Sequence, residues 1–182
     1  MHSLRMSVLF HYLHFLLSFF CFFDTNLKKE LNGISPDVRF FHSCFKNRHG
    51  TSPFESVKDA RSAIRFLKKN GHRFGIDTSR IVASGGSAGG HLAACTALID
   101  EVNEPSDDFS FSPVPYALVL FNPVVDTGKR GYGFEKVKGR EFEISPVHHI
   151  TEGVPPTLIM HGKDDKTVPY ENVVRFSHET AG

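Results

Sequence analysis

Three short apolar runs, each without alternating polar residues, predict three buried β-strands. Continuous runs of this kind are typical of strands covered on both faces, as in a parallel sheet flanked by helices. A fourth strand is expected within Val38–Phe45. The three strands are Ile81–Ser84, Ala117–Phe121 and Thr157–Met160.

Helical patterns lie between and after these strands. Ser52 is expected to cap the first helix, with Pro53 at its first position and Glu55 completing a capping box. Its apolar positions recur at spacings of three and four, and Asn70-Gly71 is expected to end it. Strands that alternate with helices predict an α/β fold with a mostly parallel sheet. Two further helices are expected, over Leu92–Ile99 and Glu171–Thr180.

The sequence Gly85-Gly86-Ser87-Ala88-Gly89 carries the clearest chemical signal. It follows a predicted strand and precedes a predicted helix, which is the context of a nucleophile elbow, Gly-x-Ser-x-Gly. Such a turn lifts the serine hydroxyl to the edge of the sheet, where the positive end of the next helix points at it. Ser87 is therefore the predicted nucleophile, and the N–H of Ala88 is the predicted oxyanion donor. A Cβ at Gly85 or Gly89 would collide where strand and helix cross, and Gly86 is the third glycine of the elbow.

Other interpretations of these glycines fit less well. A phosphate-binding P-loop requires a lysine after its last glycine, but His91 follows Gly90 here. No register of the loop supplies the Gly-x-Gly-x-x-Gly of a dinucleotide-binding fold. A glycine-rich helix start with Ser87 as its capping residue stays open as the structural alternative.

A second motif directly follows the strand at Thr157–Met160. It runs from His161 to Pro169 as His-Gly-Lys-Asp-Asp-Lys-Thr-Val-Pro, and it places a carboxylate in a turn after a strand, downstream of the serine. Together with Gly-Gly-Ser-Ala-Gly-Gly-His, this motif resembles the α/β-hydrolase superfamily, in its acetyl-esterase and lipase-like carboxylesterase branch. The resemblance covers about residues 46–182.

This resemblance implies that Asp165 is the acid of a Ser-Asp-His triad, because it stands at the motif position that carries the acid in the family. The acid would fix the tautomer of a histidine and stabilise the imidazolium. Asp164 is the neighbouring alternative, although its place suits a turn residue. Asp126 is a more distant alternative, since some relatives carry the acid after the strand at Ala117–Phe121.

The triad histidine is expected after one further helix and one further strand. His178 is the only histidine after Asp165, and it falls on the predicted helix itself. His161 precedes the acid and is expected to bond the backbone of its loop, and His148 and His149 also precede it. We therefore expect the triad histidine to be missing from this chain.

The upstream part of the family pattern is also incomplete. Residues 1–48 contain no His-Gly-Gly loop, which supplies the second oxyanion donor in the family, and His49-Gly50 opens directly into a helix. Residues 46–182 are therefore interpreted as an incomplete domain, a partial α/β-hydrolase fold that lacks its first and last strands. Open sheet edges of this kind predict poor solubility.

Residues 1–45 are interpreted as a separate apolar leader or a mis-read segment, because they lie outside the resemblance. The sixteen residues Val8–Phe23 are rich in Leu, Phe and Val. As a helix they would span about 24 Å, short of a hydrocarbon core of about 30 Å. Only weak membrane contact is expected, and localisation stays unknown. Secretion or membrane association would require that this segment be genuine.

Composition excludes several kinds of partner. The formal net charge is only +1, so the basic side chains of the first helix predict a solvated face rather than a nucleic-acid site. The three cysteines lack the spacing of a zinc site or a disulfide framework, and no metal or cofactor is expected. The basic side chains are Arg61, Arg65, Lys68 and Lys69, and the cysteines are Cys21, Cys44 and Cys95.

The glycine-containing segment 122–152 resembles the loop that hangs over the site in this family. Its aromatic residues either line an acyl pocket or anchor the loop to the body. These residues are Tyr132, Phe134 and Phe142.

The leading interpretation is a serine carboxylic-ester hydrolase, resembling acetyl esterases and lipases, that acts on a small-molecule or carbohydrate ester. A prolyl-oligopeptidase-type serine peptidase shares both motifs and stays open as the alternative enzyme. A truncated hydrolase remnant without catalysis is the non-enzyme alternative. Loss of a histidine or of one oxyanion donor lowers the rate by orders of magnitude, so the activity of this 182-residue chain is expected to be weak.

Overall fold

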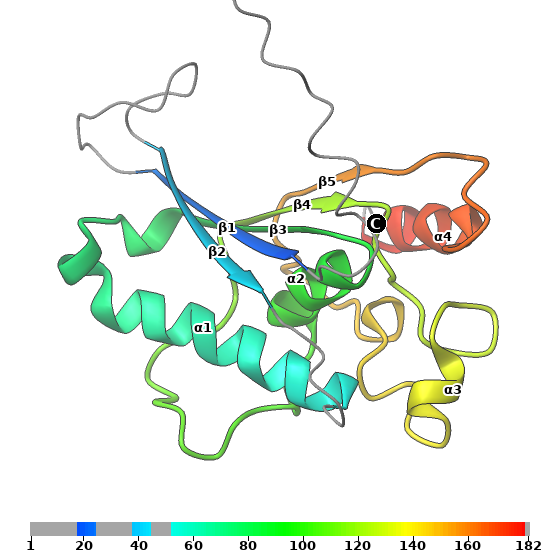
Figure 1. Ribbon diagram of the computed structural model, residues 1–182, viewed down its shortest axis with the longest axis horizontal. Helices are drawn as coiled ribbons and strands as arrows, with labels where there is room; N and C mark the ends of the chain where they lie inside the picture. The colour runs from blue at the N-terminus through cyan, green and yellow to red at the C-terminus, as the bar shows by residue number, and fades with distance from the viewer. Residues whose placement is uncertain (1–17, 25–37, 45–51, 181–182) are drawn as a thin grey trace, which may run out of the picture.

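The computed structural model describes residues 18–24, 38–44 and 52–180. Within them, five strands form one sheet in the order β2-β1-β3-β4-β5 (Figure 1). Strands β3, β4 and β5 are parallel, whereas β1 is antiparallel to both of its neighbours, β2 and β3. The strands are β1 (Ser18–Asp24), β2 (Val38–Cys44), β3 (Ile81–Gly86), β4 (Ala117–Phe121) and β5 (Thr157–Met160).

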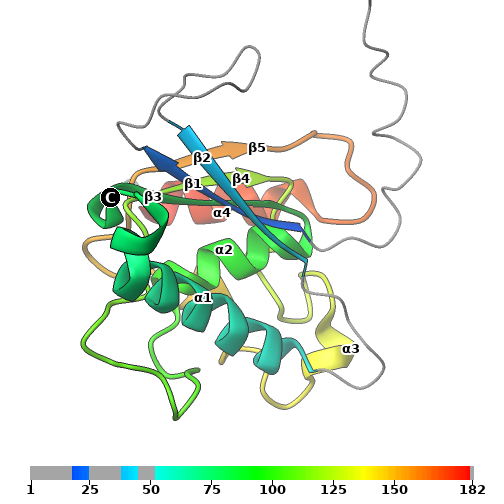
Figure 2. The same ribbon diagram turned by 60° about the vertical axis from the view of Figure 1, so that its left-hand side comes forward.

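Helices connect the parallel strands and cover the sheet. Figures 1 and 2 show α1 and α2 side by side against one face of the sheet, and α4 follows β5. This arrangement confirms the predicted α/β fold with a mostly parallel sheet flanked by helices. The α-helices of the described ranges are α1 (Pro53–Phe74), α2 (Ala88–Leu98), α3 (Phe134–Val137) and α4 (Tyr170–Thr180), with short 3₁₀ turns at Thr78–Arg80 and Pro146–His148.

The strand predictions are confirmed at all four places. Ile81–Ser84 is extended by two residues to Gly86, and β4 and β5 have the predicted bounds. The fourth strand, expected within Val38–Phe45, is β2. The helix expected from Leu92 begins four residues earlier, at Ala88, because the turn at Ser87 leads directly into helical backbone.

The start of α1 is also as predicted, but its end is not. The Ser52 Oγ accepts the N–H of Glu55 at 3.3 Å, so Ser52 is the N-cap. The helix continues past Asn70-Gly71 and ends at Gly75, whose φ of 60° is left-handed. Gly71 lies inside the helix. It is glycine because a Cβ at this position would collide with the Thr78 side chain. It is a packing glycine rather than a cap.

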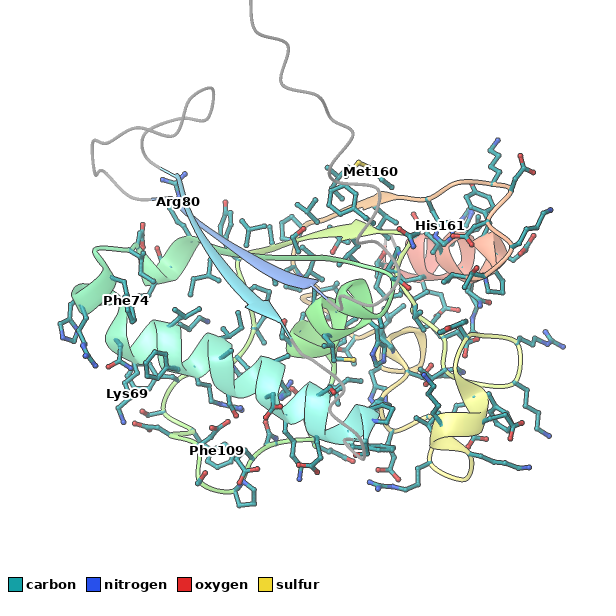
Figure 3. All side chains as sticks on the ribbon, in the orientation of Figure 1. Lys69, Phe74, Arg80, Phe109, Met160 and His161 are labelled. Carbon is teal, nitrogen blue, oxygen red and sulfur yellow. The ribbon has the colours of Figure 1, made fainter. Side chains whose placement is uncertain are left out.

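Two arginines of α1 are buried, which corrects the prediction that they belong to a solvated face. Arg61 is 2% exposed and donates to Asn103 Oδ1 at 2.9 Å. Arg65 is 5% exposed and pairs with Asp107 at 2.9 Å. Lys69 points to solvent as predicted (Figure 3). The ion pair between Arg65 and Asp107 joins α1 to the segment before β4, over 40 residues away in the sequence.

The outer strand β5 is covered on one face only by the described residues. Leu158 and Met160 are 56% and 41% exposed, and Met160 points away from the helices on the other face (Figure 3). The prediction that all three parallel strands are covered on both faces is therefore wrong for β5. The prediction of poor solubility is untested.

The amino-terminal range contributes two of the five strands. β1 lies between β2 and β3 in the sheet, with Phe22 opposite Val82. Of the apolar run Val8–Phe23, residues 8–17 fall outside the described ranges. None of the helices that the structure describes is long and apolar enough to cross a membrane.

Candidate active site

Ser87 occupies the sharp turn between β3 and α2. Its backbone angles, φ 53° and ψ −121°, lie in a region that residues other than glycine adopt only with strain. The Ser87 N–H donates to the Phe121 carbonyl oxygen at 2.9 Å, and the Ser87 carbonyl oxygen accepts the Val124 N–H at 3.3 Å. The end of β4 and the loop that follows it therefore hold the strained turn in place.

The Ser87 side chain makes no capping hydrogen bond to α2, and the residue is half-buried. The alternative of a merely helix-capping serine is therefore wrong. Ala88 is the first residue of α2, so its N–H has no acceptor within the helix. The first turn of a helix also carries a partial positive charge. This end of α2 is thus chemically suited to stabilise a nearby oxyanion.

The glycines of the turn differ in how much space surrounds them. A Cβ at Gly85 would lie 2.5 Å from the Gly89 carbonyl oxygen and 2.9 Å from the Gly90 nitrogen. The predicted collision of strand and helix at Gly85 is therefore confirmed. A Cβ at Gly86 would meet nothing closer than 3.8 Å. Gly90, which the sequence analysis passed over, is crowded by Pro123 at 2.8 Å.

Asp165 lies in the turn after β5, on the same carboxyl edge of the parallel strands as Ser87. Its Oδ1 accepts the N–H groups of Val168 at 3.0 Å and Thr167 at 2.8 Å. These backbone bonds, chiefly that of Val168, hold the pKa of the Asp165 carboxyl below its usual value. The group is therefore a carboxylate at neutral pH, as the acid of a triad must be.

His161 lies beside this carboxylate. Its Nε2 is 3.5 Å from Asp165 Oδ2 and 3.0 Å from the Val168 carbonyl oxygen. The expectation that His161 bonds the backbone of its loop is confirmed. Its side chain is 1% exposed, and Nδ1 has no hydrogen-bond partner among the described residues. The edge of its ring meets the Tyr170 ring.

The other acidic candidates do not approach a histidine within the described ranges. Asp126 is 5% exposed and accepts the Gly128 N–H at 2.7 Å, a bond within its own turn. Asp164 is exposed. Of the candidate acids, the structure brings Asp165 alone next to a histidine ring, and no described histidine forms a hydrogen bond with the Ser87 hydroxyl.

The remaining candidate histidines have other surroundings. His178 is exposed on α4 and borders a groove shared with His161. His148 pairs with the Ser145 hydroxyl at 2.8 Å, and His149 with the Phe142 carbonyl at 2.7 Å.

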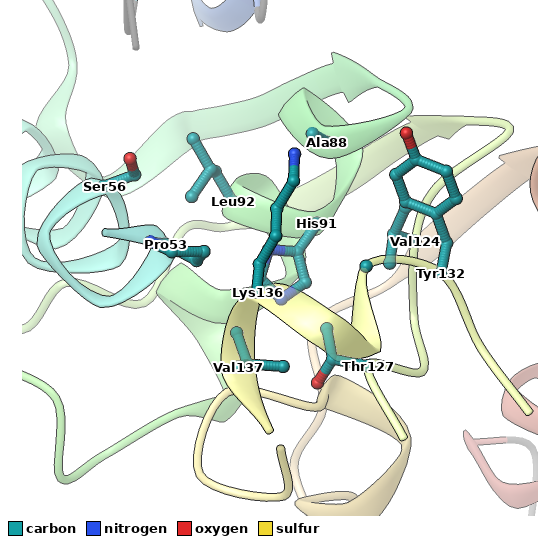
Figure 4. Close-up of a pocket in the computed structure, with 11 residues that line it drawn as sticks. Pro53, Ser56, Ala88, His91, Leu92, Val124, Thr127, Tyr132, Lys136 and Val137 are labelled. Carbon is teal, nitrogen blue, oxygen red and sulfur yellow. The ribbon is translucent and has the colours of Figure 1, made fainter. Parts of the chain in front are cut away.

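A cleft with a volume of about 100 Å³ opens beside Ala88 at the start of α2 (Figure 4). Tyr132 lines the cleft, which agrees with the prediction that aromatic residues of segment 122–152 line an acyl pocket. Phe134 and Phe142 do not line it. Phe142 instead stacks edge-on with His148, in keeping with the anchoring alternative. The lining residues are Pro53, Ser56, Ala88, His91, Leu92, Val124, Thr127, Tyr132, Gly133, Lys136 and Val137.

His91 lines the cleft from α2 and has a role that the sequence analysis missed. Its Nε2 lies 2.6 Å from the Ile144 carbonyl oxygen, and the Cys95 sulfur lies 3.4 Å from the same nitrogen. Burial lowers the pKa of His91 below its usual value, so the ring is neutral at pH 7. The only signal in the sequence was the place of His91 four residues after the serine, one helical turn on.

Cys95 is fully buried in α2, as predicted for a small core residue, and burial raises the pKa of its thiol. Across the described ranges, no three His, Cys, Asp or Glu side chains gather in a way that could hold a metal ion.

The chain is similar to one family profile and to several curated proteins. The BD-FAE family profile matches residues 47–128, a range that contains the serine turn. A "Probable carboxylic ester hydrolase LipM" of Mycobacterium tuberculosis is 26% identical over 171 residues, which cover 81% of this chain and 37% of that protein. An "Endo-1,4-beta-xylanase B" of Butyrivibrio fibrisolvens is 26% identical over 134 residues, which cover 68% of this chain and 21% of that protein.

Solved structures agree with these sequence matches. The apo form of esterase 2 from Thermogutta terrifontis superimposes with a TM-score of 0.72 at 38% sequence identity, over 79% of this chain and 56% of that chain. The chain therefore spans about a fifth to two fifths of the length of the curated relatives, and just over half of this solved one.

Proposed function

Because the chain belongs to the esterase-like α/β hydrolases, we propose that it is a serine carboxylic-ester hydrolase with Ser87 as its nucleophile. One observation carries this proposal. Ser87 directly precedes the first residue of α2, and its backbone is held at φ 53°. Its hydroxyl makes no capping hydrogen bond to this helix. A strained backbone at a residue whose hydroxyl makes no hydrogen bond to the helix is typical of a catalytic nucleophile held in position by the fold.

In the proposed reaction the ester carbonyl lies between Ser87 and the cleft beside Ala88. The Ser87 Oγ attacks the acyl carbon, and its proton passes to a histidine base while an acyl-enzyme forms and the alcohol leaves. The Ala88 N–H donates to the developing oxyanion, assisted by the positive end of α2. Water then attacks the acyl-enzyme and releases the acid.

Asp165 is proposed to orient the histidine base and to stabilise its charged form. Its lowered pKa and its place after β5 support this role. We do not assign the base to His161, because its Nε2 already faces the Val168 carbonyl and its ring is enclosed. His178 is exposed on α4 rather than in a loop at the strand ends. We therefore propose none of these described histidines as the base.

The size of the cleft supports a small acyl ester as substrate, such as an acetyl group on a carbohydrate or another alcohol. Its volume is only about 100 Å³, which is small for a ligand site and suits a short acyl group. Its walls are largely aliphatic, with Leu92, Val124 and Val137 close to Ala88.

A fluorophosphonate probe tests the proposal, because it phosphonylates an activated serine. We expect one equivalent of label, located on the peptide that contains Ser87 by mass spectrometry. Label should disappear in Ser87→Ala and remain in Ser56→Ala, since Ser56 also lines the cleft but sits on α1. Label on another serine, or no label at all, would overturn the assignment.

A further inference from the structure

The cleft beside Ala88 contains one cationic side chain. Lys136 comes from the short helix α3 and extends across the cleft toward the start of α2 (Figure 4). The neighbouring walls are apolar, formed by Leu92, Val124 and Val137. Among the residues that line this cleft, Lys136 has the only charged side chain, and it adds to the partial positive charge at the start of α2.

The Lys136 side chain forms no ion pair or hydrogen bond with any residue that the structure describes, and only its backbone N–H donates, to the Gly133 carbonyl oxygen at 2.9 Å. The described ion pairs of lysine join other residues, such as Lys58 with Glu55 and Lys69 with Asp108. Residues 128–138 contain one acidic side chain, Glu135. Besides Lys136 they contain three basic ones, Lys129, Arg130 and Lys138. Residues 128–138 are therefore locally positive, although the wider segment 122–152 contains five acidic and five basic side chains.

We propose that the cleft selects esters that carry a carboxylate, and that the Lys136 ammonium binds this carboxylate. This inference rests on the proposed function, because it names the substrate class of the same site. The apolar walls would hold a short aliphatic chain, and the ester group at its near end would lie beside Ala88. A half-ester of a dicarboxylic acid has this pattern of groups. A charge pair beside apolar walls is screened less than one in open water.

The test measures binding, so that it does not depend on turnover. Chemical-shift titration of the Ser87→Ala protein compares monomethyl glutarate, which is an anion at pH 7, with neutral dimethyl glutarate. We expect the anion to bind about fivefold more tightly, a typical gain for one partly exposed charge pair. The preference should vanish in Lys136→Gln, persist in Lys136→Arg, and shrink in about 0.5 M salt.

Lys138→Gln is the matched control, because Lys138 lies in the same segment but does not line the cleft. Equal affinity for the two esters, absence of binding, or an equal loss in Lys138→Gln and Lys136→Gln would each overturn the inference. Failure of fluorophosphonate labelling with an intact charge preference would instead overturn the hydrolase assignment and leave Lys136 as an anion-binding residue.

Discussion

The Nε2 atom of His91 lies 2.6 Å from the carbonyl oxygen of Ile144, and this contact ties the helix after Ser87 to the segment that covers the cleft. The two residues are 53 positions apart in the sequence. His91 is 6% exposed and Ile144 is fully buried. The arrangement of the cleft therefore depends on a neutral imidazole that donates to a backbone carbonyl.

Acid should weaken the fold through His91. Burial is the largest effect on this ring and lowers its pKa below 6.5, so the unfolded chain binds a proton at a higher pH than the folded one. The free energy of unfolding should fall as pH decreases through 6.5 toward the lower folded pKa. Urea denaturation of the wild type at several values between about pH 7.5 and 5.5 measures this slope.

His91→Gln provides the comparison, because its amide can still donate to the Ile144 carbonyl but does not titrate. Its slope with pH should be shallower than that of the wild type. His91→Leu leaves the carbonyl without a donor and should lose about 1–3 kcal/mol at pH 7. An identical pH slope in wild type and His91→Gln would show that other groups cause it.

Gly85→Ala should destabilise the protein by about 3 kcal/mol, because its Cβ would press on the backbone of α2. Gly86→Ala adds the same methyl group one residue later, where the nearest atom is 3.8 Å away. Its effect should stay below about 1 kcal/mol. Chemical denaturation of both variants checks the difference. Similar losses at the two positions would mean that the close crossing of β3 and α2 is not what restricts Gly85.

Asp165→Asn should separate the structural role of this residue from its proposed chemical one. The amide oxygen can still accept the Thr167 and Val168 N–H groups, so the melting temperature at pH 7 should change little. In a protein whose triad is completed by a histidine, reaction of Ser87 with the probe should nevertheless slow by about 10³- to 10⁴-fold, the typical loss when a triad acid is replaced. Asp164→Asn is the control and should label at the wild-type rate. If Asp165→Asn also labels normally, Asp165 is only a turn residue.

Arg65→Met should cost about 3 kcal/mol of stability, since it leaves the half-buried Asp107 carboxylate without its buried cation. Lys69→Met removes the partner of Asp108 at nearly the same distance, 2.8 Å, but both of those side chains are exposed. It should have no measurable effect on the urea midpoint. A comparable loss in Lys69→Met would show that the total charge of α1, and not burial, sets the stability.

Local signals were enough to predict four of the five described strands, the start of α1 and the serine turn, but not β1. The capping pattern around Ser52 and the apolar run Ala117–Phe121 each act within a few residues, so their sequences contain the information. The crowding at Gly85 was predictable for the same reason, because strand, turn and helix are contiguous in the chain.

Contacts between distant segments were not predictable in this way. Gly71 looked like a helix end because its reason for being glycine is the side chain of Thr78, which packs back onto the helix. Arg61 and Arg65 looked solvated because their partners, such as Asn103 and Asp107, lie some 40 residues away. The sequence interpretation treated residues 1–45 as separate from the hydrolase domain, yet β1 pairs with β3. No local pattern in residues 18–24 indicates which strand they pair with.

The strained backbone of Ser87 affects which substitutions evolution would favour at this position. Glycine adopts φ 53° and ψ −121° without strain, so Ser87→Gly should yield a more stable protein than Ser87→Ala. A lineage that no longer needed a hydroxyl here would gain stability from a single-residue change to glycine. The serine at this turn is therefore a residue that selection for fold alone would tend to discard.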